Sequence, residues 1–470
     1  MRILQSVFTV CFLFLFLVAA RAEGLPPQVV DALSRAEIPP FAVGAYVQEI
    51  GGPVMAEMNQ DIPLAPASTM KLVTTSAALE LLGPTYTWKT RAYVDGIQQG
   101  DVLRGNLVIK GSGDPAFMVE HLWQLLRRIR ARGIREIKGD LVLDRSVFEQ
   151  AVFDPAGFDG DPAKPYNVGA DALLLNYKVL GFRFLPDAAE GRVTVATDPP
   201  LAGYPILAPS MTNDECGDWR GRLQPVIDAS GARFGGSYSA LCGERTLYLH
   251  PYQISQTQYF AMVFRQIWKE LGGCLKGEVV DGIVPPDARM VAEWESAPLP
   301  QVIRDINKFS NNVMARQLLL TIGAEALQLP ATPDRGAAIV HMWLANKKGI
   351  DTSRLVMDNG VGLSRVERIP ALTMARLLAN VYRSPLMPEF LSSMPLIGLD
   401  GTMRQRLRNQ PVTGRGHIKT GMLNDARAIA GYVLAASGKS YVVVCMINHA
   451  NASRSQEALD VLLQWIFEKG

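Results

Sequence analysis

The chain has 470 residues, of which 48% are hydrophobic and 20% are charged. This composition excludes a disordered protein and is ample for two or three domains with large cores. Its 47 lysines and arginines nearly balance its 45 aspartates and glutamates, so the chain lacks a basic field that would bind nucleic acid or an anionic membrane non-specifically.

The first 22 residues have the pattern of a secretory signal peptide. Arg2 precedes an apolar stretch from about Val7 to Ala19, and Ala20 and Ala22 form an A-x-A cleavage pattern. A retained membrane anchor is the alternative, but the apolar stretch is short for a spanning helix and no later run is longer. We therefore expect an exported, periplasmic protein without a stable membrane anchor, soluble or loosely associated with the membrane or the cell wall.

Residues 23–92 form the first of three zones. Residues 41–50, "FAVGAYVQEI", have a strand pattern, and a helix is predicted from Ser68 to near Gly83. Ser68 and Lys71 lie three residues apart in an otherwise apolar run, so they share one face of this helix. Because a buried ammonium loses its hydration, Lys71 needs either a partner or a chemical task. The pair has the geometry of a nucleophile and its base.

The middle zone, residues 93–289, is predicted to be rich in strands, because alternating or apolar runs are broken by Gly, Pro and Asp. Two helical stretches interrupt it, at residues 121–133 and 258–273. Cys216 and Cys242 lie in polar, turn-rich segments, and we expect them to form a disulfide that closes a loop of about 25 residues, worth roughly 3 kcal/mol. Cys445 lies in an apolar strand and is expected to be a buried free thiol. No cysteine or histidine spacing resembles a zinc site, so neither a metal nor a cofactor is expected.

The third zone, residues 290–470, is predicted to be helical to about Phe390 and then to form strands. Residues 428–436 and 440–448 have the pattern of an antiparallel hairpin. A closing helix follows, with Ser453 and Gln456 at capping-box spacing. Its apolar stripe consists of Leu459, Leu462, Leu463 and Ile466.

Two further motifs accompany S-x-x-K. Ser310 and Asn312 form an S-x-N at the start of a predicted helix, and Lys419, Thr420 and Gly421 form a K-T-G on a predicted strand. Taken singly, each residue also has a structural explanation. Ser68 could be a helix cap, Asn312 a polar residue in a first helical turn, and Lys419 a solvated charge on an edge strand. The three motifs nevertheless occur once each, in the order found in penicillin-binding proteins and serine β-lactamases. A histidine-based serine hydrolase is disfavoured, because the chain has no G-x-S-x-G.

The motifs predict an acyl-transfer mechanism. Ser68 would attack a carbonyl to form an acyl-enzyme. Lys71 would accept its proton, because burial and the nearby Lys419 lower the pKa of the Lys71 amine. Ser310 would pass the proton to the leaving amine, and Asn312 would hold the substrate's amide.

The K-T-G strand is predicted to bind the substrate. Lys419 and Thr420 would bind a free carboxylate, and Gly421 would let the substrate backbone approach the strand edge. The amides of Met422 and Ser68 would form the oxyanion hole.

The whole mature chain resembles the D-alanyl-D-alanine carboxypeptidase/endopeptidase family, the class C low-molecular-mass penicillin-binding proteins of peptidase family S13. Besides "HIKTG", the resemblance lies in "GSGDPAF", "DRSVFE", "SAPLPQVIRDINKFSNN" and "DNGVGLSR", which are residues 111–117, 144–149, 296–312 and 358–365. It implies a mixed α/β (α+β) fold, a serine β-lactamase/transpeptidase-like domain with helices on both sides of an antiparallel sheet, split by a large β-rich insertion. The insertion explains the 242 residues between Ser68 and Ser310.

The resemblance also implies domain limits. The catalytic domain would comprise residues 23–92 and 290–470. One inserted domain would comprise residues 93–165 and 244–289, and a second would comprise residues 166–243.

The substrate implied by the resemblance is the D-Ala-D-Ala end, or the D-Ala to diaminopimelate crosslink, of peptidoglycan stem peptides, with β-lactams as covalent inhibitors. Asp144, Phe148, Arg365 and Asn424 would lie near the D-centre of the diamino acid. The sequence departs from the commoner D-G-S-G-L-S-R at Asn359 and Val361, which argues against a role for a side chain at either position. Two alternatives remain: a β-lactamase-like hydrolase, and a non-catalytic protein that binds the cell wall.

Overall fold

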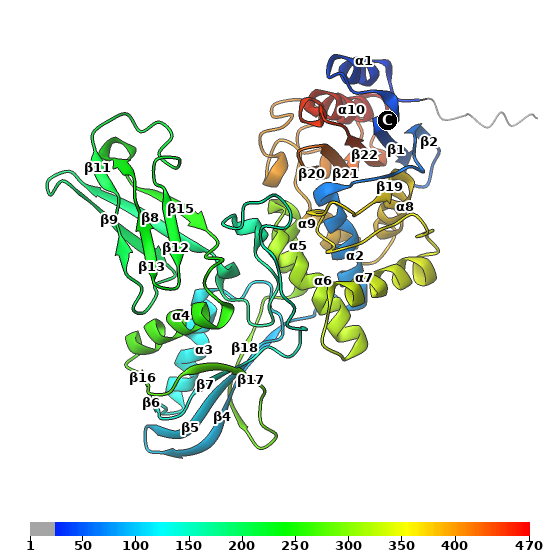
Figure 1. The fold of residues 1–470 in the computed structure, drawn as a ribbon. Coiled ribbons are helices and arrows are strands. Elements are labelled where there is room, and N and C mark those ends of the chain that lie inside the picture. Colours follow the sequence, from blue (N-terminus) through cyan, green and yellow to red (C-terminus); the bar gives the residue numbers. More distant parts are fainter. Residues whose placement is uncertain (1–23) are drawn as a thin grey trace, which may run out of the picture.

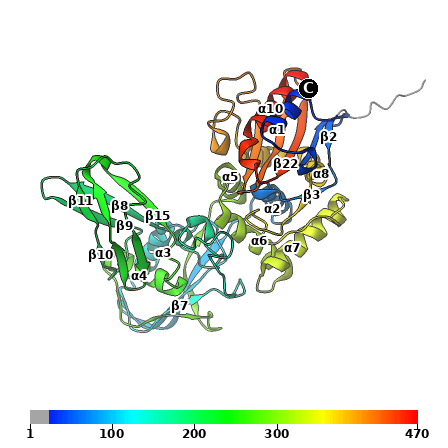
Figure 2. The same cartoon turned by 45° about the horizontal axis from the view of Figure 1, so that its top comes forward.

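The computed structural model describes residues 24–470, so the predicted signal peptide lies outside the described residues. Two bodies of secondary structure are visible, one built from both ends of this range and one from its middle (Figures 1 and 2). The mixed α/β fold with a split domain is thereby confirmed. Within residues 24–470, no helix has both the length and the apolar character needed to cross a bilayer.

The body built from both ends of the range contains the three predicted motifs, and we call it the catalytic body after that prediction. It is organised around a five-stranded antiparallel sheet of order β2-β1-β22-β21-β20. The predicted hairpin is confirmed as β21 and β22. The strands are β1 (Val43–Glu49), β2 (Val54–Met58), β20 (Gly416–Met422), β21 (Ala426–Leu434) and β22 (Ser440–Asn448). A short pair, β3 (Pro63–Leu64) and β19 (Ile369–Pro370), lies outside this sheet.

Strand alternation divides the core of this body into two layers. On β22, Val443, Cys445 and Ile447 pack on the side of α1 (Pro27–Arg35) and α10 (Gln456–Lys469). Val442, Val444 and Met446 face the larger helical layer instead. Because both faces of the strand are buried, its sequence is a continuous apolar run, and Cys445 is a buried free thiol as predicted.

The larger helical layer carries two of the three motifs. At its centre, every residue of α2 from Met70 to Leu79 is buried, and α2 contacts α5, α6 and α7. The helices of this layer are α2 (Met70–Leu81), α5 (Leu299–Phe309), α6 (Asn312–Leu327), α7 (Pro333–Met342), α8 (Ala371–Tyr382) and α9 (Met387–Ser393).

The closing helix confirms its apolar stripe but not its cap. Leu459, Leu462, Leu463 and Ile466 are buried against the sheet. The helix α10 begins only at Gln456, because residues 452–454 form a separate 3-10 turn, so Ser453 and Gln456 do not form the predicted capping box.

The insertion begins with a mixed sheet of order β16-β6-β5-β4-β18, to which β7 and β17 are added. Helices α3 (Val119–Ala131) and α4 (Gln256–Glu270) supply its core, close to the two predicted helical stretches. The strands are β4 (Lys89–Gln99), β5 (Val102–Lys110), β6 (Glu136–Ile137), β7 (Leu141–Asp144), β16 (Cys274–Leu275), β17 (Val279–Gly282) and β18 (Arg289–Glu295).

A smaller all-β unit extends from this sheet (Figures 1 and 2). Its three sheets have the orders β15-β8-β9, β10-β13-β12 and β11-β14. The strands are β8 (Leu180–Asp187), β9 (Arg192–Asp198), β10 (Ile206–Leu207), β11 (Ser210–Thr212), β12 (Pro225–Asp228), β13 (Gly231–Phe234), β14 (Ser237–Ser239) and β15 (Arg245–Leu249).

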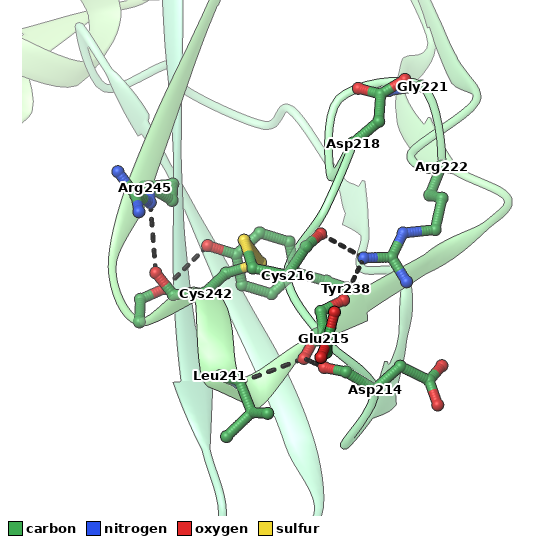
Figure 3. The surroundings of a disulfide bond; sticks show 12 residues. Asp214, Glu215, Cys216, Asp218, Gly221, Arg222, Tyr238, Leu241, Cys242 and Arg245 are labelled. Carbon is green, nitrogen blue, oxygen red and sulfur yellow. Dashed lines mark hydrogen bonds between the residues drawn. A yellow bond between two sulfur atoms is a disulfide. The ribbon is translucent and has the colours of Figure 1, made fainter.

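The predicted disulfide lies in this smaller unit and is confirmed: Cys216 and Cys242 are bonded (Figure 3). Around it, Arg222 donates to the carbonyls of Glu215, at 2.8 Å, and of Cys216. The bond therefore ties an irregular segment to the end of β14, in a unit whose strands are mostly short.

The strand limits suggest different domain limits from those predicted. Since β4 begins at Lys89 and pairs with β18, which ends at Glu295, we propose that the insertion spans residues 89–295. Since β15 pairs with β8, we propose that the smaller unit spans about residues 180–249.

Candidate active site

The three motifs meet at one place in the catalytic body. Ser68 lies on a 3-10 turn, Ala67–Thr69, that leads into α2. Ser310 ends α5 in the left-handed conformation, with φ of 59°, and Asn312 begins α6. Lys419 lies on β20, an edge strand of the sheet. The turns that precede α2 and α6 and the edge strand β20 therefore bring the three motifs together at Ser68.

Lys71 has three oxygen neighbours. Its Nζ lies 3.0 Å from Ser68 Oγ, 2.6 Å from Asn312 Oδ1 and 2.6 Å from the Val361 carbonyl oxygen. A neutral amine has two N–H groups and one lone pair. Because the amide and carbonyl oxygens only accept hydrogen bonds, they take the two N–H groups, and the lone pair is left for the Ser68 hydroxyl proton. This is the geometry of a serine and its general base.

The surroundings favour the neutral form of this amine. Burial lowers the pKa of Lys71 well below its ordinary value, and the cations Lys419 and Arg316 lower it further, whereas Glu367 opposes them. Lys71 has no solvent-exposed surface. Its neighbours are thus mostly cationic or uncharged, which answers why a lysine lies in an apolar run.

The second lysine lies beside the second serine. Lys419 Nζ donates to Ser310 Oγ at 2.9 Å and to the Thr420 carbonyl at 2.7 Å. Burial lowers the pKa of Lys419 to about 7. A carboxylate bound here would stabilise the ammonium form. The Thr420 hydroxyl donates to Thr402 Oγ1 at 2.8 Å, which holds the strand edge against residues 401–403.

The glycine of K-T-G serves the protein's own packing. A Cβ on Gly421 would lie 2.7 Å from the Pro66 carbonyl oxygen and 3.0 Å from Ser68 N. The close neighbours of Gly421 are therefore residues 66–68, and the expectation that this glycine lets the substrate backbone approach stays a prediction. The next residue, Met422, is 67% exposed at the strand edge.

The loop that contains "DNGVGLSR" holds the base, through Glu367 and a backbone carbonyl that the sequence analysis did not single out. The buried Glu367 carboxylate accepts hydrogen bonds from the backbone N–H groups of four residues in the segment 358–362, at 2.6–3.2 Å. This segment supplies the Val361 carbonyl to Lys71. Burial raises the pKa of Glu367, and the backbone donors oppose that rise. Gly362, with φ of 80°, packs against the Ala67 carbonyl, so the loop and the Ser68 turn fit together.

Ser68 opens into a cavity of about 1000 Å³. On the catalytic side its walls include Ser310, Asn312, Thr420, Met422, Asn424 and Arg365. The opposite wall comes from the insertion and includes Phe158, Asp159, Asp161, Lys164, Tyr166, Tyr177 and Tyr248. The two bodies of the molecule therefore build one site together.

Of the four residues predicted near the D-centre, Arg365 and Asn424 line this cavity, but Asp144 and Phe148 do not. The Asp144 carboxylate is 1% exposed; it accepts from Ser146 and from the Val284 N–H, and lies 3.6 Å from Lys110 Nζ. Phe148 is buried among apolar side chains of the insertion and α6. Local partners occupy the Asp144 carboxylate and the core encloses the Phe148 ring, so their position near the substrate stays a prediction.

The acidic residues of the cavity come instead from a loop that the sequence did not single out. Asp159 accepts from Tyr166 and Asn167, at 2.6 and 2.8 Å. Asp161 lies 3.5 Å from Lys164 and its side chain is 46% exposed. Of the two acids, Asp161 therefore retains free oxygen acceptors. In this Gly-, Pro- and Asp-rich segment, no periodicity distinguishes a binding loop from an ordinary turn.

The cationic counterpart is Arg365. Its guanidinium lies over the Phe158 ring, at 4.5 Å from the ring centroid, and 3.6 Å from Asp425, with half of the side chain exposed. Within residues 24–470, no group of three or more His, Cys, Asp or Glu side chains is arranged to hold a metal ion.

Comparisons with known proteins place this geometry in context. The sequence model of the D-Ala-D-Ala carboxypeptidase 3 (S13) family matches residues 27–466. The chain is 29% identical to a D-alanyl-D-alanine carboxypeptidase of Actinomadura sp. strain R39, over 80% of this chain and 72% of that protein. It is 26% identical to D-alanyl-D-alanine carboxypeptidase DacB of Haemophilus influenzae, over 84% and 82% of the two chains.

Solved structures show the same fold. Penicillin-binding protein 4 of Haemophilus influenzae superposes with a TM-score of 0.78 at 23% identity, covering 94% of this chain and 99% of that one. A predatory endopeptidase of Bdellovibrio bacteriovorus superposes with a TM-score of 0.54 at 16% identity, covering 90% and 93% of the two chains.

Proposed function

The chain belongs to the D-Ala-D-Ala carboxypeptidase 3 (S13) family and is a penicillin-binding serine hydrolase of D-alanyl-D-alanine peptides, and from this premise we propose that Ser68 forms the acyl-enzyme with Lys71 as its base. The observation that carries this assignment is the Lys71 amine with two fixed acceptors and one serine neighbour. Ser310 and Lys419, which belong to the same body as Ser68, take part in the later steps.

Acylation begins when the Ser68 hydroxyl gives its proton to Lys71 and its oxygen attacks the carbonyl of the penultimate D-alanine. The C–O bond to Ser68 forms as the peptide bond to the terminal D-alanine breaks. Ser310, which lies between Lys419 and the cavity, passes its proton to the leaving amine and takes one in turn from the Lys71 ammonium, which becomes neutral again. The amides of Ser68 and Met422 stabilise the oxyanion. Water then attacks the ester, the neutral Lys71 takes the proton of the water, and this proton passes to the Ser68 oxygen as the ester bond breaks, which restores both residues.

The substrate's ends are held on opposite sides of Ser68. Lys419 and Thr420 bind the terminal carboxylate, and Asn312 binds an amide of the peptide. On the other side, the D-centre of a diamino acid presents an ammonium and a carboxylate. The half-exposed carboxylate of Asp161, which lies beside Lys164, is complementary to the ammonium, and Arg365 is complementary to the carboxylate. Asn424 lines the same wall.

Endopeptidase activity follows from the same parts. A crosslink joins D-alanine to the side-chain amine of a diamino acid, so a carboxylate also stands next to that scissile bond. Lys419 and Thr420 bind it as they bind that of D-alanine. β-Lactams acylate Ser68, because their amide and carboxylate are placed in a similar way. The natural substrate, peptidoglycan stem peptides, lies outside the cytoplasm, in agreement with the predicted export and periplasmic location.

The function is tested by D-alanine release from a diamino-acid pentapeptide that ends in D-Ala-D-Ala. We expect release by the wild type and by a control variant, Ser210→Ala, changed at the exposed first residue of β11. Release by Ser68→Ala should fall at least about a thousandfold. Retained release in Ser68→Ala would overturn the assignment. Rapid nitrocefin turnover without D-alanine release would instead favour a β-lactamase, and wall binding without acylation would favour a scaffold protein.

A further inference from the structure

A second cavity adjoins the active site. It has a volume of about 370 Å³ and is lined by Arg304, Lys308, Phe309, Leu399, Asp400, Gly401 and Arg404. We call it the Arg304–Arg404 cavity. Phe309 lines this cavity and the active-site cavity alike, and Gly401 is followed by Thr402, which lines the active site. The two cavities are therefore neighbours along two separate stretches of the chain.

Some charged side chains of this cavity have partners within the protein and others do not. Lys308 is nearly buried and paired with Asp400 at 2.5 Å, and the other Asp400 oxygen accepts from the Leu396 N–H at 2.8 Å. Arg304 and Arg404 are exposed, and among residues 24–470 neither guanidinium has a hydrogen bond or an ion pair. Two free cations therefore remain, and each can bind a carboxylate through two parallel N–H groups.

The cavity also offers apolar surface. Phe309 is 65% exposed and Leu399 is 55% exposed, although both are large apolar side chains. Apolar surface beside free guanidinium groups fits an anionic peptide better than a free inorganic anion, because a peptide covers apolar surface as well as pairing charge.

The position of the cavity identifies which part of a substrate reaches it. Thr402 is hydrogen-bonded to Thr420, the residue next to Lys419. The carboxylate beside the scissile bond binds at Lys419 and Thr420, so atoms attached beyond it pass Thr402 towards the cavity. The diamino acid of the other half, the peptide that acylates Ser68, lies at the other wall, near Arg365 and the insertion.

We propose that the Arg304–Arg404 cavity binds the leaving stem peptide of a crosslink through carboxylates of that peptide beyond the scissile bond. The inference rests on the proposed endopeptidase function. When the crosslink is hydrolysed, the amide bond between D-alanine and the side-chain amine breaks, and the amine leaves on a whole peptide with its own C-terminal carboxylate. A single leaving D-alanine ends at Lys419 and does not reach the cavity.

The test compares two substrates of the full-length protein. One is a purified crosslinked tetrapeptide dimer, and the other is a monomeric pentapeptide that ends in D-Ala-D-Ala. In Arg304→Gln/Arg404→Gln, kcat/KM for the dimer should fall about ten- to a hundredfold, and kcat/KM for the monomer should change less than about twofold. A matched control, Arg192→Gln/Arg233→Gln, removes two exposed charges from the smaller unit of the insertion and should change neither value.

A third substrate separates binding of carboxylates from other effects. A dimer whose leaving half has its carboxylates beyond the scissile bond amidated should be cleaved as slowly by the wild type as by the double variant. Equal losses on dimer and monomer, no loss on the dimer, or a wild type that cleaves only the monomer would overturn the inference and leave the carboxypeptidase function intact. A wild type that is not acylated by penicillin and does not cleave the monomer would instead refute the proposed function.

Discussion

Lys71 and Lys419 belong to a central helix and a sheet strand, whereas Asp161 and Tyr166, on the opposite wall of the same cavity, belong to a loop of the insertion. Neither lysine has exposed surface, but the Asp161 side chain is 46% exposed. Burial shifts the pKa of each lysine and fixes its position, which acid–base chemistry requires. An exposed loop gives less control over pKa but offers acceptors to a bound ligand. From this difference we infer that the catalytic body performs the reaction, while the insertion contributes to the choice of peptide.

The largest effect should follow a change at the buried base. In Lys71→Met the side chain keeps an unbranched shape but loses the proton acceptor, so penicillin acylation and D-alanine release should both fall about a thousandfold or more. Stopped-flow acylation kinetics measure the first and an amine assay the second. Lys138→Met, which removes one member of a half-exposed ion pair with Glu136, should leave both rates unchanged. Acylation at an unchanged rate in Lys71→Met would remove this lysine from the mechanism.

A smaller effect is expected at Lys419. Loss of a charge-assisted contact is worth roughly 1.5 to 3 kcal/mol, so Lys419→Ala should lower acylation efficiency about ten- to a hundredfold. Amidation of the substrate's terminal carboxylate should penalise the wild type far more than the variant. Equal penalties would show that Lys419 does not bind the carboxylate.

The pH dependence provides a control for the same residue. Because the pKa of Lys419 is about 7, its ammonium is present below pH 7 and is lost as the pH rises through 7. The wild-type kcat/KM should therefore decline above about pH 7, and the decline of kcat should lie at higher pH, since a bound carboxylate raises this pKa. Lys419→Ala should lack this limb.

A change on the insertion should affect one substrate class only. Asp161→Asn removes the charge proposed to pair with the D-centre ammonium, so kcat/KM for a diaminopimelate pentapeptide should fall about tenfold. The same pentapeptide with its D-centre ammonium acetylated, and benzylpenicillin, should react as with the wild type. A parallel loss of penicillin acylation would contradict the division between the two regions.

The smallest effect on the chemistry should come from the disulfide. Cys216→Ser/Cys242→Ser should cost about 3 kcal/mol of stability in the smaller unit, as measured by thermal unfolding of the insertion. Penicillin acylation should change less than about twofold, because the bond lies after β14 in the smaller unit of the insertion, whereas Ser68 leads into α2 of the catalytic body. A large loss of acylation would show that the insertion supports the catalytic centre directly.

The same two regions differ in what their sequences predict. Short motifs in a fixed order bring Ser68, Lys71, Asn312 and Lys419 together, because each motif begins a helix or lies on a strand whose position the fold sets. The strand pattern, the hairpin and the disulfide were predictable for the same local reasons. The contact between Lys71 and Val361 could not be predicted. It uses a backbone carbonyl 290 residues from Lys71, and a residue of any type at position 361 would have the same carbonyl.

The insertion shows why a resemblance alone does not establish the role of a residue. Asp144 stands in a recognisable motif, but its partners are the next turn and a neighbouring strand end. A motif can persist because it builds the fold rather than because it binds the substrate. The residues that face the cavity, Asp161 and Tyr166, lie in a segment without regular periodicity, where only the folded chain reveals which side chains are free.

The central claim is that one serine of the catalytic body carries the acyl group. Intact-protein mass spectrometry after benzylpenicillin, followed by peptide mapping, tests it most directly. The account predicts a single adduct, on the peptide that contains Ser68, and none in Ser68→Ala. An adduct that persists in Ser68→Ala, or one that maps to a peptide without Ser68, would contradict it.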